Sequence, residues 1–308
     1  MMKIIYFGTP DFAVKPLEKL IEYADVVAVV TQPDRPVGRS NKPVACPVKQ
    51  LAIKHNIPVL QYEKIRRDGV EDLKSFKADM MVSCAYGQIF SKEILDITPL
   101  GIYNIHGSIL PKYRGAAPIQ WSIIKGEEYC GITILKTDIG MDDGDILLTY
   151  PVKIEKDETS AELFDRLSVV GADAILDAVK LLESGNYTLT PQKEEESTRC
   201  KMLTADMSTI DFSKTAQEVA NMIHGINPWP VAKVEIEGNI FKIFKVTVRK
   251  EYSGNAGEIL VSSNKQGLIV ACGKGAIEFL EIQPQNGKKM TAKSYLNGKQ
   301  IQIGAIVK

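Results

Sequence analysis

Three polar side chains in the stretch 101–145 have the types and the spacing of a catalytic site. Asn104 and His106 stand two residues apart near the end of a short apolar run, so in a strand both project from one face. Asp142 comes after a second strand-like run, in an acidic turn. An amide offers N–H donors, an imidazole exchanges a proton near neutral pH, and a carboxylate can orient it. These are the groups needed to move a carbonyl group onto an amine.

A metal centre is not expected at this site. One histidine among crowded aspartates is a poor ligand set for zinc. The cysteines are scattered, form no CxxC pair and are expected to be reduced and mostly buried: Cys46, Cys84, Cys130, Cys200 and Cys272.

The sequence around the trio predicts an α/β fold. Short apolar runs alternate with helical segments such as 47–55, which is typical of a mostly parallel, Rossmann-like sheet with crossover helices. The predicted strands are 3–7, 26–31, 58–60, 80–84 and 101–106. In such sheets ligands bind beyond the carboxyl ends of the strands. Asn104 and His106 lie at such an end.

The clearest helix covers residues 159–184. Thr159 and Glu162 have the spacing of a capping box, and Gly185 ends the helix. An apolar stripe marks the face that packs on the sheet: Leu163, Leu167, Val170, Ala174, Ala178 and Leu181.

The length of 308 residues favours two domains. Residues 1–185 form the first, 186–206 read as a polar linker, and 207–308 form the second. Five short strands with hairpin turns follow a helix at 215–226 and predict a small, OB-like β-barrel: 231–237, 240–249, 257–261, 267–271 and 276–282.

Charge points to two basic regions in a chain of zero formal net charge. Residues 206–308 carry 13 Lys and Arg against 9 Asp and Glu, and the last acidic residue is Glu281. The loop 32–47 is long, rich in proline and basic, with Arg39 and Lys42. Either region suits a phosphate backbone, and either is also typical of an ordinary surface.

No signal peptide or membrane-spanning run is apparent, so the sequence predicts a cytoplasmic protein without a membrane partner. Nothing in it suggests an obligate interface, and a monomer is expected.

The central motif N-I-H-x-S-x-L-P-x-x-R-G-x-A-P-I-Q, followed by a D-x-G-D turn, resembles the folate-dependent formyltransferases. The opening FGTPDFAV, the loop TQPDRPVGR and NPWP at 227–230 narrow the resemblance to the family members that act on initiator tRNA. The similarity covers nearly the whole chain.

The resemblance implies transfer of the formyl group of 10-formyltetrahydrofolate to the α-amino group of methionine on initiator methionyl-tRNA, for translation initiation. Asn104, His106 and Asp142 match the catalytic trio, and Arg39 with Lys42 matches a segment that grips the tRNA acceptor end. No metal is implied. The residues matching the folate-contacting stretches are Ser108, Ile109, Leu110 and Pro111, with Tyr86, Gly87, Gln88 and Ile89 as the wall of the pterin pocket.

Three alternatives stay open at this point. The acceptor could be a small amine, such as an amino sugar or glycinamide ribonucleotide. The same trio would suit a hydrolase of formyl-folate. A catalytically silent RNA-binding protein is a third reading, although RNA binding does not require the trio.

Overall fold

The structure is a computed structural model that describes residues 1–36 and 42–308. Its internal contacts divide the chain into two compact units. Unit 1 comprises Met1–Gly115, Cys130–Val152 and Phe164–Arg199; unit 2 comprises Ala116–Tyr129, Lys153–Leu163 and Cys200–Lys308. The predicted domain limits follow the order of the chain, whereas each compact unit gathers pieces from several places.

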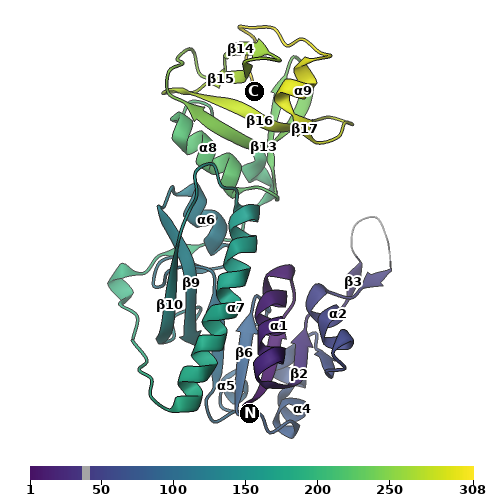
Figure 1. The fold of residues 1–308 in the computed structure, drawn as a ribbon, viewed down its shortest axis with the longest axis vertical. Helices are drawn as coiled ribbons and strands as arrows, with labels where there is room; N and C mark the ends of the chain where they lie inside the picture. Colours follow the sequence, from purple (N-terminus) through teal and green to yellow (C-terminus); the bar gives the residue numbers. More distant parts are fainter. Residues whose placement is uncertain (37–41) are drawn as a thin grey trace. The chain divides into compact units, whose positions relative to one another are not determined.

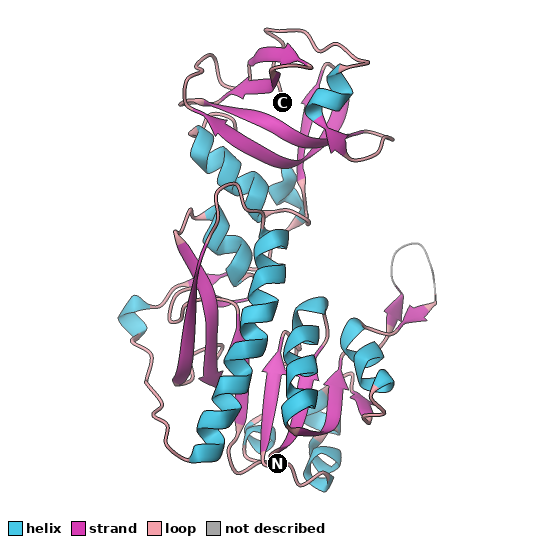
Figure 2. Ribbon diagram, in the orientation of Figure 1, coloured by secondary structure: helices cyan, strands magenta, loops and turns pink. Residues whose placement is uncertain are grey.

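Unit 1 is built on one mostly parallel sheet, which confirms the predicted α/β class (Figure 1, Figure 2). Among the described residues its seven strands lie in the order β10-β9-β7-β6-β1-β2-β5. Neighbouring pairs from β7 through β6, β1 and β2 to β5 run parallel. The bounds are β1 Lys3–Gly8, β2 Asp25–Thr31, β5 Val59–Gln61, β6 Met80–Cys84, β7 Ile102–His106, β9 Tyr129–Lys136 and β10 Ile146–Lys153.

The strand β9 pairs antiparallel with β7, so the sheet is mixed at this edge. The register places Thr133 opposite His106 and Leu135 opposite Asn104. The loop from β9 to β10 contains the acidic turn 141–145.

Both faces of the sheet are covered, as parallel strands require. Ile5 and Phe7 of β1 join one apolar cluster with Leu73 of α4 (Val70–Ser75) and Ile94 of α5 (Lys92–Leu95). Ile102 belongs to the same cluster. Because side chains alternate along a strand, Asn104 and His106 project from this face of β7 as well.

The opposite face is covered by α1 (Val14–Tyr23) and α7 (Ser160–Ser184), which lie side by side in Figure 1. Gly171 of α7 allows close packing, because a Cβ there would lie 3.3 Å from Cγ2 of Ile105. The predicted capping box is confirmed: the backbone N–H of Thr159 donates to Oε2 of Glu162 at 2.8 Å, and that of Glu162 to Oγ1 of Thr159 at 3.3 Å. The remaining helices and short strands of unit 1 are η1 Asp11–Ala13, β3 Arg35–Pro36, β4 Pro43–Val44, α2 Pro47–Lys54, α3 Ile65–Asp68, β8 Arg114–Gly115 and η2 Glu194–Glu196.

Unit 2 contains an antiparallel sheet around its own apolar core. Its strand order within the described chain is β12-β13-β16-β15-β14, with β17 paired to β16. The bounds are α6 Pro118–Ile124, η3 Ala205–Ser208, α8 Ala216–Gly225, β12 Ala232–Ile236, β13 Asn239–Arg249, β14 Ile259–Ser263, β15 Gly267–Ala271, β16 Ala276–Pro284, β17 Met290–Thr291 and α9 Ala292–Leu296. The short strand β11, Arg199–Cys200, pairs with β8 at the point where the chain passes from unit 1 to unit 2.

Residues 304–308 join the two outer strands of this sheet. The backbone N–H of Val307 donates to the oxygen of Gly257 at 2.8 Å, just before β14. Lys308 exchanges two backbone hydrogen bonds with Glu235 of β12, at 2.8 and 3.0 Å. This segment therefore connects the edges that a barrel must close. No helix in the described part of the chain is long and apolar enough to cross a membrane.

Candidate active site

Asn104 is oriented by its neighbour on the next strand. Ser83 of β6 lies opposite Asn104 in the register, is buried, and donates from Oγ to Oδ1 of Asn104 at 2.9 Å. Because the amide oxygen is held by this bond, the Nδ2 donor points away from Ser83. Asn104 is half-buried and can offer that N–H group to a substrate.

His106 is buried at the end of β7, and one of its ring nitrogens is already bonded. Nε2 lies 3.0 Å from the backbone oxygen of Tyr113. A carbonyl can only accept, so Nε2 carries the proton and the neutral ring has its lone pair on Nδ1.

Asp142 faces that lone pair. Its Oδ1 lies 3.7 Å from Nδ1 of His106, and its Oδ2 accepts the backbone N–H of Gly115 at 2.9 Å. The imidazole is 6% exposed and the carboxylate 19%, so the pair is shielded from bulk water. The turn is tight, because a Cβ at Gly144 would collide with the backbone oxygen of Lys136.

The geometry thus unites a proton-exchanging pair with an amide donor from the same sheet face. His106 and Asp142 can pass a proton through Nδ1, while Asn104 can stabilise negative charge on a nearby oxygen. Acyl transfer needs both functions.

The loop after β7 is fixed by Thr133 of β9, the partner of His106 in the register. Thr133 Oγ1 donates to the backbone oxygen of Ser108 at 2.7 Å and accepts the N–H of Leu110 at 3.2 Å. Ser108 is fully buried and its hydroxyl donates to the oxygen of Lys112 at 2.7 Å. Ile109 and Pro111 are half-buried. Of these predicted folate contacts, Ser108 therefore serves the loop itself.

The segment 86–89 follows β6, which is next to β7. Gln88 is engaged internally: its Oε1 accepts the N–H of Ile65 at 2.9 Å, and its Nε2 donates to the oxygen of Tyr62 at 2.8 Å. Gly87 is exposed and Ile89 is 65% exposed. Tyr86 is buried beside Phe90, and its hydroxyl has no hydrogen-bond partner in the structure as described.

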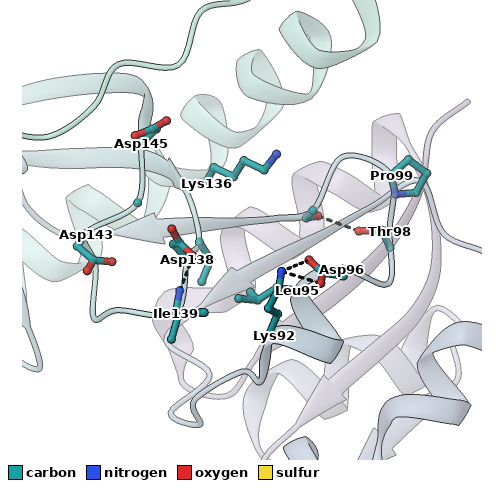
Figure 3. A pocket seen from close by; sticks show the side chains of 13 residues that line it. Lys92, Leu95, Asp96, Thr98, Pro99, Lys136, Asp138, Ile139, Asp143 and Asp145 are labelled. Atoms are coloured by element: carbon teal, nitrogen blue, oxygen red, sulfur yellow. Dashed lines mark hydrogen bonds and ion pairs between the residues drawn. The ribbon is translucent and has the colours of Figure 1, made fainter.

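A polar cavity of about 510 Å³ borders the acidic turn (Figure 3). Figure 3 shows Lys92 bonded to Asp96, and Asp138 accepting the backbone N–H of Ile139 at 2.7 Å. The lining residues are Lys92, Leu95, Asp96, Thr98, Pro99, Gly101, Lys136, Thr137, Asp138, Ile139, Asp143, Gly144 and Asp145. None of the eight predicted folate residues lines this cavity, so their assignment stays a prediction.

Two further predictions concern tRNA and metal. Arg39 lies outside the described residues, and Lys42 is exposed. Within the part of the chain that the structure describes, no group of three or more His, Cys, Asp and Glu side chains is placed to hold a metal ion.

Sequence reasoning missed several residues that hold the trio. Ser83 had one available signal, a hydroxyl within the apolar strand 80–84. Tyr113 and Gly115 act through backbone atoms, for which side-chain type is no guide.

Comparison with known proteins identifies the class. The family model "Formyl transferase" matches residues 2–179, and "Formyl transferase, C-terminal domain" matches residues 202–300. The chain belongs to the formyl transferase family. The N-formyltransferase of Helicobacter canadensis, solved with folinic acid and dTDP-3-aminofucose, has the same fold, with a TM-score of 0.70 at 21% identity over 91% of this chain and 99% of that one.

Full-length relatives are more specific. Methionyl-tRNA formyltransferase of Acetivibrio thermocellus is 43% identical over 310 residues, covering 99% of each chain. The protein of the same name from Clostridium botulinum is also 43% identical over 310 residues, with the same coverage.

Proposed function

We propose that this protein transfers the formyl group of 10-formyltetrahydrofolate to the α-amino group of methionine on initiator tRNA, in the cytoplasm. The observation that carries the proposal is the placement of Asn104, His106 and Asp142 around the end of β7, in a chain 43% identical to methionyl-tRNA formyltransferases along its whole length. Transfer to a small amine, hydrolysis of formyl-folate and RNA binding without catalysis are the alternatives that a labelled-transfer assay distinguishes.

Asn104 stabilises the charge that develops during transfer. The folate donor supplies an activated formyl group when bound. As the amine attacks the formyl carbon, negative charge grows on the formyl oxygen, and Nδ2 of Asn104 donates to that oxygen. Ser83 keeps the amide in the required orientation. A donor of this kind is worth about 10²–10³ in rate.

His106 and Asp142 move the proton. A free α-amine has a pKa of about 7.7–8.0, and esterification to the tRNA lowers that pKa further, so a usable fraction of the amine is neutral near pH 7 and a strong base is not needed. The amine loses a proton as the new N–C bond forms, and the carboxylate of Asp142 or Nδ1 of His106 takes it. The same pair returns a proton to the folate nitrogen from which the formyl group departs. The separation of 3.7 Å is closed by a small shift or by one water.

The residues that follow β6 and β7 suit a flat aromatic ligand. Ile89 and Gly87 offer an exposed apolar side chain and bare backbone beside the buried Tyr86. Ile109, Leu110 and Pro111 would contact the same ligand from the segment after β7. The internally bonded Ser108 and Gln88 fix the shapes of the two segments.

Arg39 and Lys42 grip the acceptor end of the tRNA, and the C-terminal unit binds its backbone. Lys289 and Lys293 pair with Glu281 and Glu278, at 2.6 and 3.8 Å. Of the five lysines that follow Glu281, this leaves Lys288, Lys299 and Lys308 as candidates for phosphate contacts.

The test is direct transfer of label. Purified protein is given 10-formyltetrahydrofolate labelled in the formyl group and initiator methionyl-tRNA, and acid-precipitable label is followed. Deacylated tRNA, an amino sugar nucleotide, glycinamide ribonucleotide and water serve as competing acceptors. Rapid transfer to methionyl-tRNA with little to the others supports the proposal. Faster transfer to a small amine, release of formate at the full rate without tRNA, or no reaction would contradict it.

A further inference from the structure

The turn that carries Asp142 is held by a side chain from the segment predicted as a linker. Nε2 of Gln192 donates to the backbone oxygen of Asp142 at 2.8 Å and to that of Gly144 at 2.7 Å. One amide nitrogen thus clamps the backbone on both sides of Asp143. Asp142 has a φ of 55°, in the left-handed region that is unfavourable for residues other than glycine. Such a conformation persists where surrounding bonds enforce it.

Gln192 is in turn oriented by a buried arginine. Nε of Arg114 donates to Oε1 of Gln192 at 3.0 Å, and Arg114 is 2% exposed. Its Nη1 donates to Oε2 of Glu194 at 2.7 Å, which anchors the guanidinium group. Because a guanidinium group can only donate, it selects the amide oxygen of Gln192 and leaves the amide nitrogen facing the turn.

The residues on either side of Arg114 contact the candidate catalytic pair. The backbone oxygen of Tyr113 accepts from His106, and the backbone N–H of Gly115 donates to Asp142. The backbone of this segment is itself tied to residue 198, since the N–H of Arg114 donates to the oxygen of Thr198 at 2.9 Å. A continuous set of hydrogen bonds therefore runs from the 190–199 segment to both members of the pair.

We propose that Gln192 is a positioning residue for formyl transfer: oriented by Arg114, it fixes the acidic turn so that the Asp142 carboxylate stays beside His106. This inference rests on the proposed function. Gln192 touches no reacting atom and acts through the backbone of the turn. A misplacement of about 1 Å in a catalytic group is enough to lower a rate by about 10²-fold.

The experiment compares Gln192→Leu with Glu195→Leu in the full chain. Glu195 is an exposed residue of the same segment, so its variant controls for a leucine at this place. We expect Gln192→Leu to lower kcat by about 10- to 100-fold, with KM for both substrates nearly unchanged, and Glu195→Leu to keep normal kcat. Assays run well below the thermal midpoint of every variant, so a loss of stability alone would leave kcat intact.

A second comparison asks whether Gln192 acts through Asp142. In an Asp142→Asn background, Gln192→Leu should lower kcat by less than about threefold, because the carboxylate that it positions is already gone. Gln192→Glu serves as a second variant in case Gln192→Leu misfolds. It keeps an oxygen that can accept from Arg114, but it replaces the N–H donor to the backbone oxygens of Asp142 and Gly144. We expect the same loss of kcat from it.

The outcomes separate this inference from the proposed function. Normal kcat in the two Gln192 variants, with low kcat in Asp142→Asn, overturns the positioning role and leaves the proposed function standing. If the losses of kcat in the two single variants multiply fully in the double variant, Gln192 acts through a group other than Asp142. That result overturns the positioning role as well. Normal kcat in Asp142→Asn refutes the assignment of the trio, and the inference falls with it.

Discussion

At the scale of single residues, the hydrogen bond from His106 to Tyr113 determines which ring nitrogen is available to exchange a proton. Nε2 is occupied by a carbonyl, so in the proposed reaction the proton is exchanged through Nδ1, the nitrogen that faces Asp142. We therefore propose His106 as the partner of the carboxylate and Asn104 as the donor to the formyl oxygen. The proposed chemistry is thus divided among the three side chains.

The first prediction concerns this division. Asn104→Ala should lower kcat by about 10²–10³-fold, because it removes one donor to developing charge. Asp142→Asn should lower kcat by about 10²–10⁴-fold through loss of proton transfer. The dissociation constants for tRNA and folate should stay nearly constant in both. Steady-state kinetics and direct binding measurements check this, and a weakened affinity at normal kcat would argue against these roles.

The second prediction concerns the thiols. Burial raises the pKa of Cys84 to about 12 and that of Cys272 to about 11, so both stay protonated at pH 8. Cys46 is half-buried and accessible by comparison. Because the thiolate is the nucleophile, iodoacetamide should label Cys46 first in the native protein. Mass spectrometry of peptides after brief labelling reads this out, and early labelling of Cys84 would contradict it.

The three residues of the proposed trio could be singled out from their types and spacing, but the residues that hold them could not. Asn104 and His106 stand out in the sequence because they are polar residues two positions apart in an apolar run. Gln192 lies in a polar segment without periodicity. Its proposed positioning role depends on a fold that brings residue 192 next to residue 142. A single sequence contains no signal for that return.

At the scale of elements, the strands and helices were largely predictable. Met80–Cys84 has the predicted bounds, and β7 differs from its prediction by one residue. Apolar runs between turn signals fix such elements. The direction of β9 was not predictable, because a buried strand has the same composition whether its neighbour runs parallel or antiparallel.

The third prediction concerns helix α8 and strand β13. His224 is buried, with Nε2 at 3.1 Å from the oxygen of Val246, and burial lowers its pKa below 6.5. The unfolded chain therefore binds this proton at a higher pH than the folded chain does. The contribution to stability is complete above about pH 7 and is lost as the pH falls below 6.5.

The free energy of unfolding, measured with urea between pH 7 and 5, checks this. His224→Gln should flatten the decline by at most about 1.4 kcal/mol per pH unit. The exposed His55 provides the matched control, His55→Gln, which should leave the slope as it is. Equal slopes in all three proteins would contradict the prediction.

At the scale of the whole molecule, the contacts proposed for tRNA are spread over distant parts of the chain. Arg39→Ala should weaken tRNA binding and reduce the slope of log K against log salt by about one unit, since one phosphate contact is lost. Folate affinity should not change. Filter binding at several salt concentrations measures the slope, and an altered folate affinity with normal tRNA binding would contradict the role of the loop.

Each compact unit is assembled from separate segments of the chain, and composition does not reveal which segments belong together. The acidic run near residue 195 predicted a connector, but which segments pack together depends on partners far away in the sequence. Helix α6 contacts α8, and Glu162 pairs with Lys245 at 2.7 Å inside unit 2.

A protease nick after the exposed Lys201 would therefore not release a free C-terminal fragment. The upstream fragment would keep residues 116–129 and 153–163, which belong to the same compact body as the downstream one. Buried contacts such as Ser160 with Asn227 would bridge the two pieces. They would elute together from a sizing column and part when denaturant is added.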